Sequence, residues 1–357
     1  MTSPVDAAIV DCLKRQNIQG KVTVALSGGL DSMVLLDAMH RIQQAVSATS
    51  ALNRPPHLDF DALPIEFDAL HVHHGLSPNA TAWAEFCQRE CDERGVSLII
   101  ARVGVDRANT DGQGIEGAAR IARYQAFQTH GASTVLAAQH ADDQAETVLH
   151  QLLRGTGLAG LAAMGEMRRL RQLHDRPNSQ RLLRPLLKIS RRDIEDTAAL
   201  RELKWVTDES NDDTTYTRNF IRHELMPLIA ARFPHANASL SRAARHAAES
   251  AEMLEALAKM DLRWGGTSAD VASPDVANPD VANPDALDDL PRARQTNALY
   301  YWLKWQGVAA PSHSQLEEWA AQLFRDSPTD KPHQAGGHGF IIRRRGGKYG
   351  KLELTRR

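Results

Sequence analysis

The amino-acid sequence predicts an α/β fold in which a parallel-sheet, nucleotide-binding domain is followed by a smaller and mainly helical domain. Three observations support this class. Short apolar runs alternate with helix-like stretches between residues 21 and 155, which is typical of βαβ units. The first run, residues 22–26, is apolar almost throughout, as in a strand covered on both faces. A polar turn with two glycines follows at residues 27–32, where parallel sheets bind ligands.

The elements of the first domain follow from local patterns. Amphipathic spacing indicates helices, and Gly131 and Gly155 close two of them. The helices are expected at residues 5–17, 32–46, 80–94, 114–131, 141–155, 190–204 and 215–232. Apolar runs bounded by turn residues indicate strands, expected at residues 21–26, 67–76, 96–103 and 133–140. Residues 47–64 are expected to be a loop, and residues 181–189 a loop or a short strand.

The second domain is expected at residues 233–357, after a first domain of residues 1–232. Inside it, three pentapeptides ending in Pro-Asp repeat at residues 271–285. Proline in every repeat excludes a regular helix or a sheet ladder, so residues 270–289 are interpreted as a flexible acidic insert. Residues 291–326 are expected to be helical, and residues 338–354 to form a closing hairpin.

The composition is that of a globular protein of two domains, with 42% apolar residues among 357. The formal net charge is only −2. Nevertheless, nine Lys or Arg lie between residues 168 and 192 against one acid, and seven lie between residues 343 and 357 against one acid. Two basic segments on a nearly neutral chain indicate a polyanionic partner, although two solvated faces would give the same pattern.

Three cysteines, Cys12, Cys87 and Cys91, are too few for a disulfide framework and lack the second pair that a metal site would need. They are interpreted as packing thiols in a reducing compartment. The N-terminus does not resemble a secretory signal, and no apolar stretch approaches the length of a membrane span. We therefore expect a cytoplasmic protein without a membrane partner.

The turn Ser27-Gly28-Gly29-Leu30-Asp31-Ser32 joins the first strand to a helix. Free amide groups at a helix N-terminus, together with glycines and hydroxyls, bind phosphate. The turn has no lysine, so it is not the Gly-x-x-x-x-Gly-Lys-Ser/Thr loop. A carboxylate beside phosphates needs a bridging cation, so Asp31 predicts Mg²⁺ and the turn predicts ATP whose pyrophosphate is held tightly. The alternative is an ordinary glycine turn with a capping residue.

This turn resembles the pyrophosphate loop of the N-type ATP pyrophosphatases, whose domain is adenine nucleotide alpha hydrolase-like. Four further stretches resemble the tRNA(Ile)-lysidine synthase family: residues 71–77, 116–127, 140–164 and 208–227. The resemblance is continuous over about residues 20–230 and weaker over residues 291–357. It implies a ligase that joins free L-lysine to C2 of cytidine 34 in the CAU anticodon of tRNA(Ile). ATP first adenylates the base and pyrophosphate leaves, and the lysine amine then displaces AMP.

Lysidine formation in this family changes the codon that is read from AUG to AUA and the tRNA identity from Met to Ile.

The resemblance also implies roles for single residues. Residues 27–32 would hold pyrophosphate, and Asp31 would hold its Mg²⁺ and act in catalysis. Ala25 and His73 would flank the adenosine, and Arg120 would face the phosphates. The alternatives are a turn or core histidine at His73 and a salt-bridged surface arginine at Arg120.

Asp143 and Glu146 are three residues apart, so they share one face of a helix that begins at the carboxyl edge of the sheet. They are the expected lysine-binding and catalytic carboxylates, and one of them would accept a proton from the lysine ammonium. Asp142 is expected to cap the helix and His140 to orient the base or a phosphate. The alternative is an acid cluster favoured by the helix dipole.

Five arginines are candidates for contacts with tRNA phosphates: Arg184, Arg191, Arg192, Arg218 and Arg222. The alternative for each is a solvated or paired surface arginine. The full third domain of longer family members is expected to be absent. No protein partner is expected to be required, and a homodimer is left open.

Three other functions would leave different signatures in the sequence. A tRNA 2-thiocytidine synthase would normally carry a Cys-x-x-Cys pair, which this sequence lacks. An amidotransferase-coupled synthetase would need a glutaminase half and would leave the basic segments unexplained. A non-catalytic nucleotide- or tRNA-binding module would be indicated by loss of Asp31, Asp143 or Glu146, and all three are present.

Overall fold

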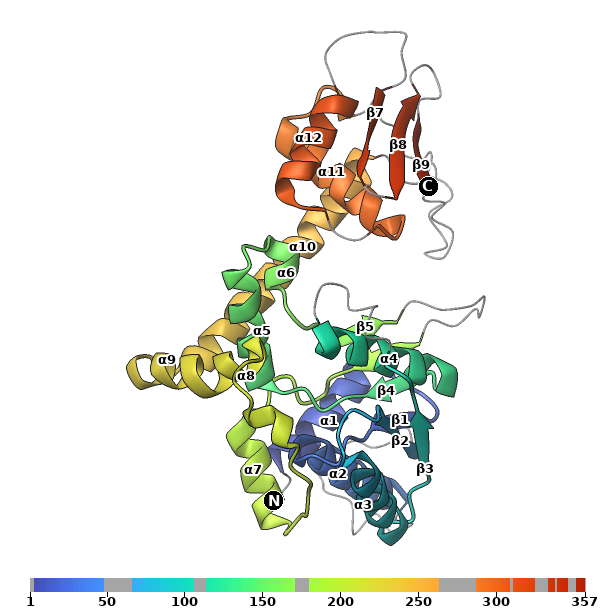
Figure 1. Ribbon diagram of the computed structural model, residues 1–357, viewed down its shortest axis with the longest axis vertical. Coiled ribbons are helices and arrows are strands. Elements are labelled where there is room, and N and C mark those ends of the chain that lie inside the picture. Colours follow the sequence, from blue (N-terminus) through green and yellow to red (C-terminus); the bar gives the residue numbers. More distant parts are fainter. Residues whose placement is uncertain are drawn as a thin grey trace. The chain divides into compact units, whose positions relative to one another are not determined.

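The computed structural model describes residues 3–47, 66–105, 114–170, 180–262, 287–308, 311–324, 333–337, 339–345 and 351–356. The chain divides into two compact units, Met1–His246 and Ala247–Arg357 (Figure 1). This division lies inside helix α10 (Ala236–Asp261), whereas the expected boundary after residue 232 falls at the end of α9 (Met226–Arg232). The repeated pentapeptides at 271–285 lie outside the described residues.

The first unit is built on a mostly parallel sheet, as predicted. Within its described residues, the strand order is β3-β2-β1-β4-β6-β5, and only β5 runs antiparallel to its neighbour. The strands are β1 (Val22–Ala25), β2 (Phe67–His73), β3 (Leu98–Arg102), β4 (Thr134–Leu136), β5 (Met167–Arg169) and β6 (Arg181–Leu183). The sequence did not indicate β5, because three residues with two arginines show no apolar alternation.

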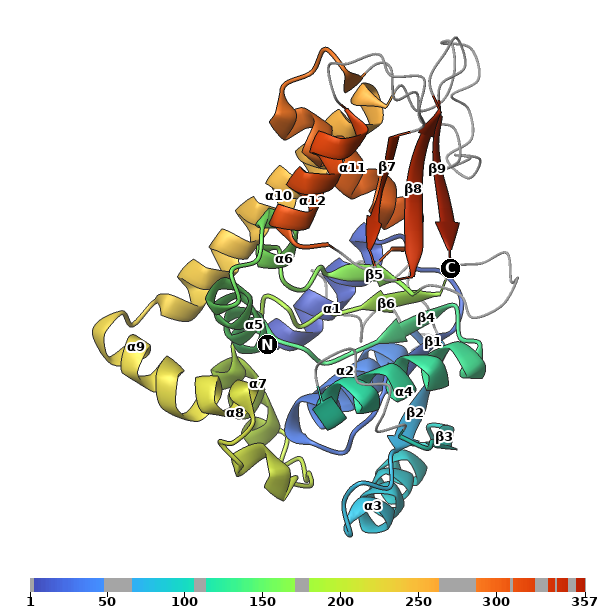
Figure 2. The same ribbon diagram turned by 45° about the horizontal axis from the view of Figure 1, so that its top comes forward.

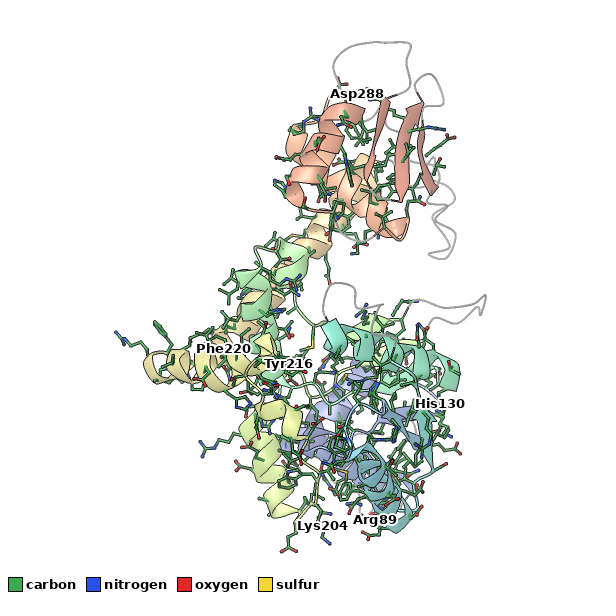
Figure 3. The ribbon with its side chains drawn as sticks, in the orientation of Figure 1. Arg89, His130, Lys204, Tyr216, Phe220 and Asp288 are labelled. Carbon is green, nitrogen blue, oxygen red and sulfur yellow. The ribbon has the colours of Figure 1, made fainter. Side chains whose placement is uncertain are left out.

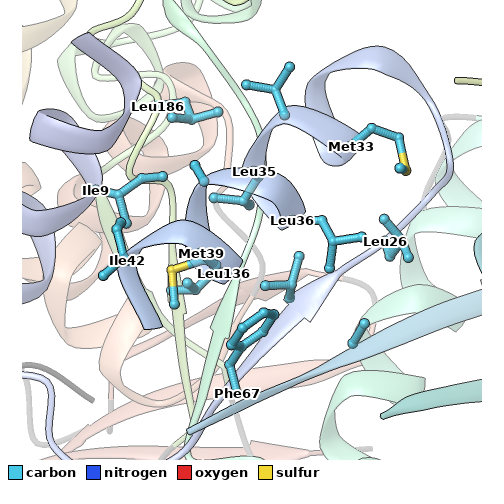
Figure 4. Packing of buried hydrophobic residues seen from close by; sticks show 14 of the residues in the cluster. Ile9, Leu26, Met33, Leu35, Leu36, Met39, Ile42, Phe67, Leu136 and Leu186 are labelled. Carbon is cyan, nitrogen blue, oxygen red and sulfur yellow. The ribbon is translucent and has the colours of Figure 1, made fainter. Parts of the chain in front are cut away.

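Helices cover both faces of this sheet. Val22 and Val24 of β1 pack into the larger cluster, which α1 (Pro4–Arg15), α2 (Leu30–Ser47), α3 (Ala80–Glu93) and α7 (Arg191–Leu200) share (Figure 4). Ala25 points the other way, into a cluster with Phe127 of α4 (Gly114–His130), which lies across the strands in Figure 2. Alternate residues of one strand therefore serve opposite layers, as the apolar run predicted.

The strand order of the sheet reverses direction next to β1. β1 lies between β2 and β4, so the connections that leave these strands run to opposite sides. α2 begins directly after β1, and α5 (Ala141–Leu153) begins shortly after β4. Open α/β sheets bind ligands at such a reversal of strand order.

The helix predicted over residues 215–232 is helical but not uniform. It comprises α8 (Thr217–Phe220), a π-helical turn (Ile221–Leu225) and α9, and a short 3₁₀ turn (Glu209–Asp212) precedes it. A single π-turn inside a helix is frequent at functional sites. A short helix, α6 (Leu158–Leu161), follows α5.

The three cysteines are free and buried, as the sequence predicts. Burial raises the pKa of Cys12 and of Cys87 to about 12, and that of Cys91 to about 11. The thiols therefore stay protonated near neutral pH and act as packing groups.

The second unit contains helices and a small sheet. Its core includes Trp302, Trp319 and Ile342. The elements are the end of α10, α11 (Arg292–Trp305), α12 (His313–Leu323), β7 (His333–Gly337), β8 (Phe340–Arg345) and β9 (Lys351–Arg356). The expected hairpin is β8 and β9, and β7 adds a third antiparallel strand. Among the described helices of the whole chain, none is long and apolar enough to cross a membrane.

Candidate active site at the carboxyl ends of β1 and β4

The turn at residues 27–32 is held by its own serines. The Ser32 hydroxyl accepts from the amides of Ser27 and Gly28, at 3.2 and 3.1 Å, and donates to the Gly29 carbonyl at 2.9 Å. The Gly29 amide donates to the Ser27 hydroxyl at 3.3 Å. Because these hydroxyl groups can rotate away, a bound phosphate oxygen can take their place and accept the hydrogen bonds of these amides.

Gly28 is required by its conformation and by its neighbours. Its φ of +87° is in the left-handed region. A Cβ at this position would lie 3.0 Å from both Cys87 Sγ and Val206 Cγ2. Val206 also donates its amide to the Gly28 carbonyl at 2.9 Å, so the segment before the 3₁₀ turn rests on the loop. Sequence reasoning missed Val206, since a lone valine outside a periodic pattern carries no signal.

Asp31 lies in the first turn of α2 and points toward α5. Its Oδ1 is buried without a hydrogen-bond partner and lies 3.7 Å from His140 Nε2. Its Oδ2 lies 3.8 Å from Arg191 Nη1. Burial raises the pKa of Asp31, and the nearby His140 and Arg191 only partly offset it. The ion pair with Arg191 is thus long, and no group among the described residues donates a hydrogen bond to Oδ1.

These features fit a magnesium ion held jointly with phosphates. Among the described residues, no group of three or more His, Cys, Asp or Glu could hold a metal on its own. Mg²⁺ commonly takes one or two carboxylates and completes its shell with phosphate oxygens and water. The Oδ1 of Asp31 has no hydrogen-bond partner and lies beside the turn of Ser27 and Ser32, so it meets that requirement.

Helix α5 begins with a reciprocal cap that positions Asp143. The His140 amide donates to Asp143 Oδ2 at 3.1 Å, and the Asp143 amide donates to His140 Nδ1 at 3.4 Å. The expected capping residue, Asp142, instead accepts from the Arg191 amide at 2.9 Å and from Asn237. His140 is almost fully buried, and its Nε2 lies 3.5 Å from Asp143 Oδ2.

Asp143 and Glu146 do share a face, and two arginines fill it. Arg222 donates to Glu146 at 2.7 and 2.9 Å and to Asp143 at 2.8 Å. Arg218 donates to Asp143 at 2.9 Å and to Glu146 at 3.3 Å. Burial acts to raise the pKa of Asp143, but His140 and the two arginines outweigh it and lower that pKa. Asp143 is therefore ionised, and the two carboxylates form a site for cations.

The five predicted tRNA-binding arginines do not lie on one surface. Arg218 and Arg222 face the carboxylates, and Arg191 borders Asp31. The side chain of Arg192 is 88% exposed and lies 3.9 Å from Asp196. Arg184 is only 2% exposed, and its Nη1 donates to the Gly165 carbonyl at 2.8 Å.

The remaining predicted residues lie around the same edge of the sheet. Ala25 ends β1, and His73 ends β2 with its Nε2 3.4 Å from Thr81 Oγ1. His71, rather than His73, contacts the end of the first strand, because its Nδ1 lies 2.8 Å from the Leu26 carbonyl oxygen. Arg120 is exposed on α4 and lies over the Tyr124 ring.

Comparisons with known proteins show which families this chain resembles. Residues 1–229 match the PP-loop domain family, and residues 284–349 match the TilS substrate binding domain family. The U34-tRNA thiolase NcsA from Methanococcus maripaludis is a distant structural neighbour, with 17% identity and a TM-score of 0.48 over 68% of this chain and 77% of that chain.

Curated relatives match most of this chain at higher identity. A tRNA(Ile)-lysidine synthase from Burkholderia mallei is 43% identical over 321 residues, which cover 88% of this chain and 58% of that protein. One from Pseudomonas aeruginosa is 39% identical over 329 residues, which cover 92% of this chain and 68% of that protein. The chain thus spans about three fifths to two thirds of the length of these relatives. With its PP-loop domain, this chain belongs to the tRNA(Ile)-lysidine synthase family.

Proposed function

We propose that this protein ligates free L-lysine to C2 of cytidine 34 in the CAU anticodon of tRNA(Ile), with ATP and Mg²⁺, in the cytoplasm. One observation carries the proposal beyond family membership. His140 lies 3.7 Å from Asp31 and 3.5 Å from Asp143, so it joins the phosphate-binding turn to the cation-binding carboxylates. A reaction that activates a base with ATP and then adds an amine needs these two sites side by side.

The first half of the reaction belongs to the turn at residues 27–32. The cytidine C2 oxygen attacks the α-phosphorus of ATP, and the bond to pyrophosphate breaks. Amides and hydroxyls of the turn bind the departing pyrophosphate, together with the positive end of the α2 dipole. Mg²⁺ bound at Asp31 would neutralise part of the charge that develops on this leaving group.

The second half belongs to Asp143 and Glu146. A lysine ammonium is a cation of the kind that these carboxylates already bind, because each accepts from a guanidinium in this structure. The amine nitrogen attacks C2, the C2–oxygen bond to the adenylate breaks, and AMP leaves. The amine gives up a proton, which one of the two carboxylates accepts.

Arg218 and Arg222 link lysine binding to tRNA binding in this proposal. They pair with the carboxylates that lysine would use, and they are also candidates for phosphate contacts. Arginine binds phosphate and carboxylate with the same forked geometry. The arrival of the tRNA backbone would therefore draw the arginines to phosphates and leave the carboxylates for lysine.

The test is incorporation of radiolabelled lysine. Purified protein is mixed with ATP, Mg²⁺, lysine and either tRNA(Ile) bearing CAU or tRNA(Met) bearing the same anticodon. Incorporation into tRNA(Ile) alone supports the proposal. Binding of both tRNA and ATP without incorporation would contradict it and would favour a binding module.

A further inference from the structure

Four side chains form a cationic cluster on the first unit that the reaction above does not use as a unit. Tyr124 lies on α4, with Arg120 one turn before it on the same helix. Arg168 comes from β5, and Arg184 follows β6 directly. The guanidinium carbons of Arg120 and Arg168 lie 5.6 and 5.4 Å from the centre of the Tyr124 ring. Arg120 and Arg184 also hydrogen-bond to the Tyr124 hydroxyl.

The cluster has no anionic partner among the described residues. No described carboxylate forms an ion pair with Arg120, Arg168 or Arg184, whereas Arg222 has two such partners. Arg184 is 2% exposed, and its Nε is buried without a hydrogen-bond partner. Burying a guanidinium nitrogen without a hydrogen-bond partner costs free energy. The position of Arg184 therefore indicates a ligand that accepts a hydrogen bond from this nitrogen.

The electrostatics of the cluster are those of an anion site. Burial lowers the pKa of Arg184, and the charges of Arg168 and Arg120 lower it further. For Tyr124, burial raises the pKa, but the three arginines outweigh it and lower that pKa. The positive charge of the neighbouring arginines contributes to both shifts. An incoming anion would remove the repulsion among the three guanidinium groups.

We infer that Arg120, Arg168 and Arg184 form, around Tyr124, a second phosphate-binding site that is separate from the turn at residues 27–32. Arginine forks match the oxygens of a phosphate group, and the exposed Arg120 and Arg168 leave an approach from solvent. Arg184 follows β6, which is separated from β1 by β4. The inference rests on the proposed function for its two sources of phosphate, which are the tRNA backbone and ATP.

Arg168→Gln is the test variant, because Arg168 is exposed on a three-residue edge strand and its removal leaves the buried core intact. The matched control is Arg89→Gln, which removes the same charge from the exposed face of α3. Figure 3 shows Arg89 well separated from α4. Binding of tRNA(Ile) is measured over a range of salt concentrations, and binding of ATP is measured without tRNA.

If the phosphate comes from tRNA, Arg168→Gln weakens tRNA binding by about 5-fold or more and makes the salt slope of log K shallower by about 0.7–0.9. ATP binding then stays as in the control. If it comes from ATP, ATP binding weakens and tRNA binding does not. Arg168→Lys, which keeps the charge but loses the fork, should recover part of the loss.

Binding of both ligands equal to that of Arg89→Gln, with Arg168→Gln folded by circular dichroism, would overturn the inference. The outcome does not depend on catalysis. Wild-type protein that fails to incorporate lysine would refute the proposed function, while the comparison of the two variants would still decide whether this site binds phosphate.

Discussion

Arg222 holds Glu146 with two hydrogen bonds, from Nε to Oε1 at 2.7 Å and from Nη2 to Oε2 at 2.9 Å. The two residues lie 76 positions apart in the chain. Glu146 is on α5, and Arg222 is on the π-helical turn between α8 and α9. The sequence predicts lysine binding for Glu146 and tRNA binding for Arg222. Their contact makes the two predicted sites neighbours.

Arg222→Gln should destabilise the protein. The Arg222 side chain is 27% exposed and that of Glu146 only 5%, so the change leaves two carboxylates poorly compensated. We expect the free energy of unfolding to fall by about 3 kcal/mol, the lower end for a broken buried pair, measured by urea denaturation. The double variant Arg222→Gln/Glu146→Gln should recover part of this loss. Strictly additive losses would show that the pair is not coupled.

Asp143→Asn should separate the two halves of the reaction. Release of pyrophosphate with tRNA(Ile) should persist, because the turn at residues 27–32 is unchanged. Lysine transfer should fall by about 100-fold, since the variant loses a charge that binds the ammonium or takes its proton. Asp92→Asn, at an exposed position of α3, is the control for the change in net charge. Undiminished transfer in Asp143→Asn would remove Asp143 from the proposed mechanism.

Asp31→Ala should abolish adenylation while leaving tRNA binding unchanged. Asp31 belongs to the turn at residues 27–32 and its Oδ1 has no hydrogen-bond partner, so its loss removes the proposed magnesium ligand. Pyrophosphate release from ATP in the presence of tRNA(Ile) measures the effect, with filter binding for the tRNA. Pyrophosphate release at the wild-type rate would argue against a role for Asp31 in holding the ion.

Gly28→Ala should cost more stability than the same change at Gly95. Both glycines have positive φ, +87° and +64°. The left-handed conformation should therefore lower the free energy of unfolding of both variants by about 1–2 kcal/mol. Only at Gly28 would the new Cβ also lie 3.0 Å from Cys87 Sγ and Val206 Cγ2, whereas the space around Gly95 is open. Thermal unfolding of the two variants isolates this contact term. Equal losses would mean that Cys87 and Val206 move aside at no cost.

His74 should make stability depend on pH below neutrality. Burial, followed by Arg123, His71 and His73, lowers the pKa of His74 to about 4. The unfolded chain takes up the proton near pH 6.5 and the folded chain only near pH 4, so this stabilising contribution is complete above 6.5 and is lost as the pH falls toward 4. Because the ring is only half-buried, we expect about 1–2 kcal/mol.

Urea unfolding of wild type and His74→Gln at pH 7 and pH 5 measures this contribution. The free energy of unfolding of the wild type, relative to that of His74→Gln, should be lower at pH 5 than at pH 7, because only the wild type carries the His74 proton linkage. A difference that is the same at both pH values would assign no such linkage to His74.

The amino-acid sequence by itself determined the βαβ succession, the turn at residues 27–32 and the shared face of Asp143 and Glu146. These features depend on periodicity and on residues within a few positions of one another, so a local pattern contains them. The apolar run 22–26 likewise predicted a strand buried on both faces, and Val22 and Ala25 do pack into opposite layers.

Only the tertiary structure decided how distant segments meet. It pairs Arg218 and Arg222 with the α5 carboxylates, buries Arg184 and gathers three arginines around Tyr124. It also adds β5, whose pairing with β6 comes from hydrogen bonds rather than from an apolar pattern. An arginine's partner depends on which segments the fold brings within a few ångströms of it, and residue type and spacing along the chain do not contain that information.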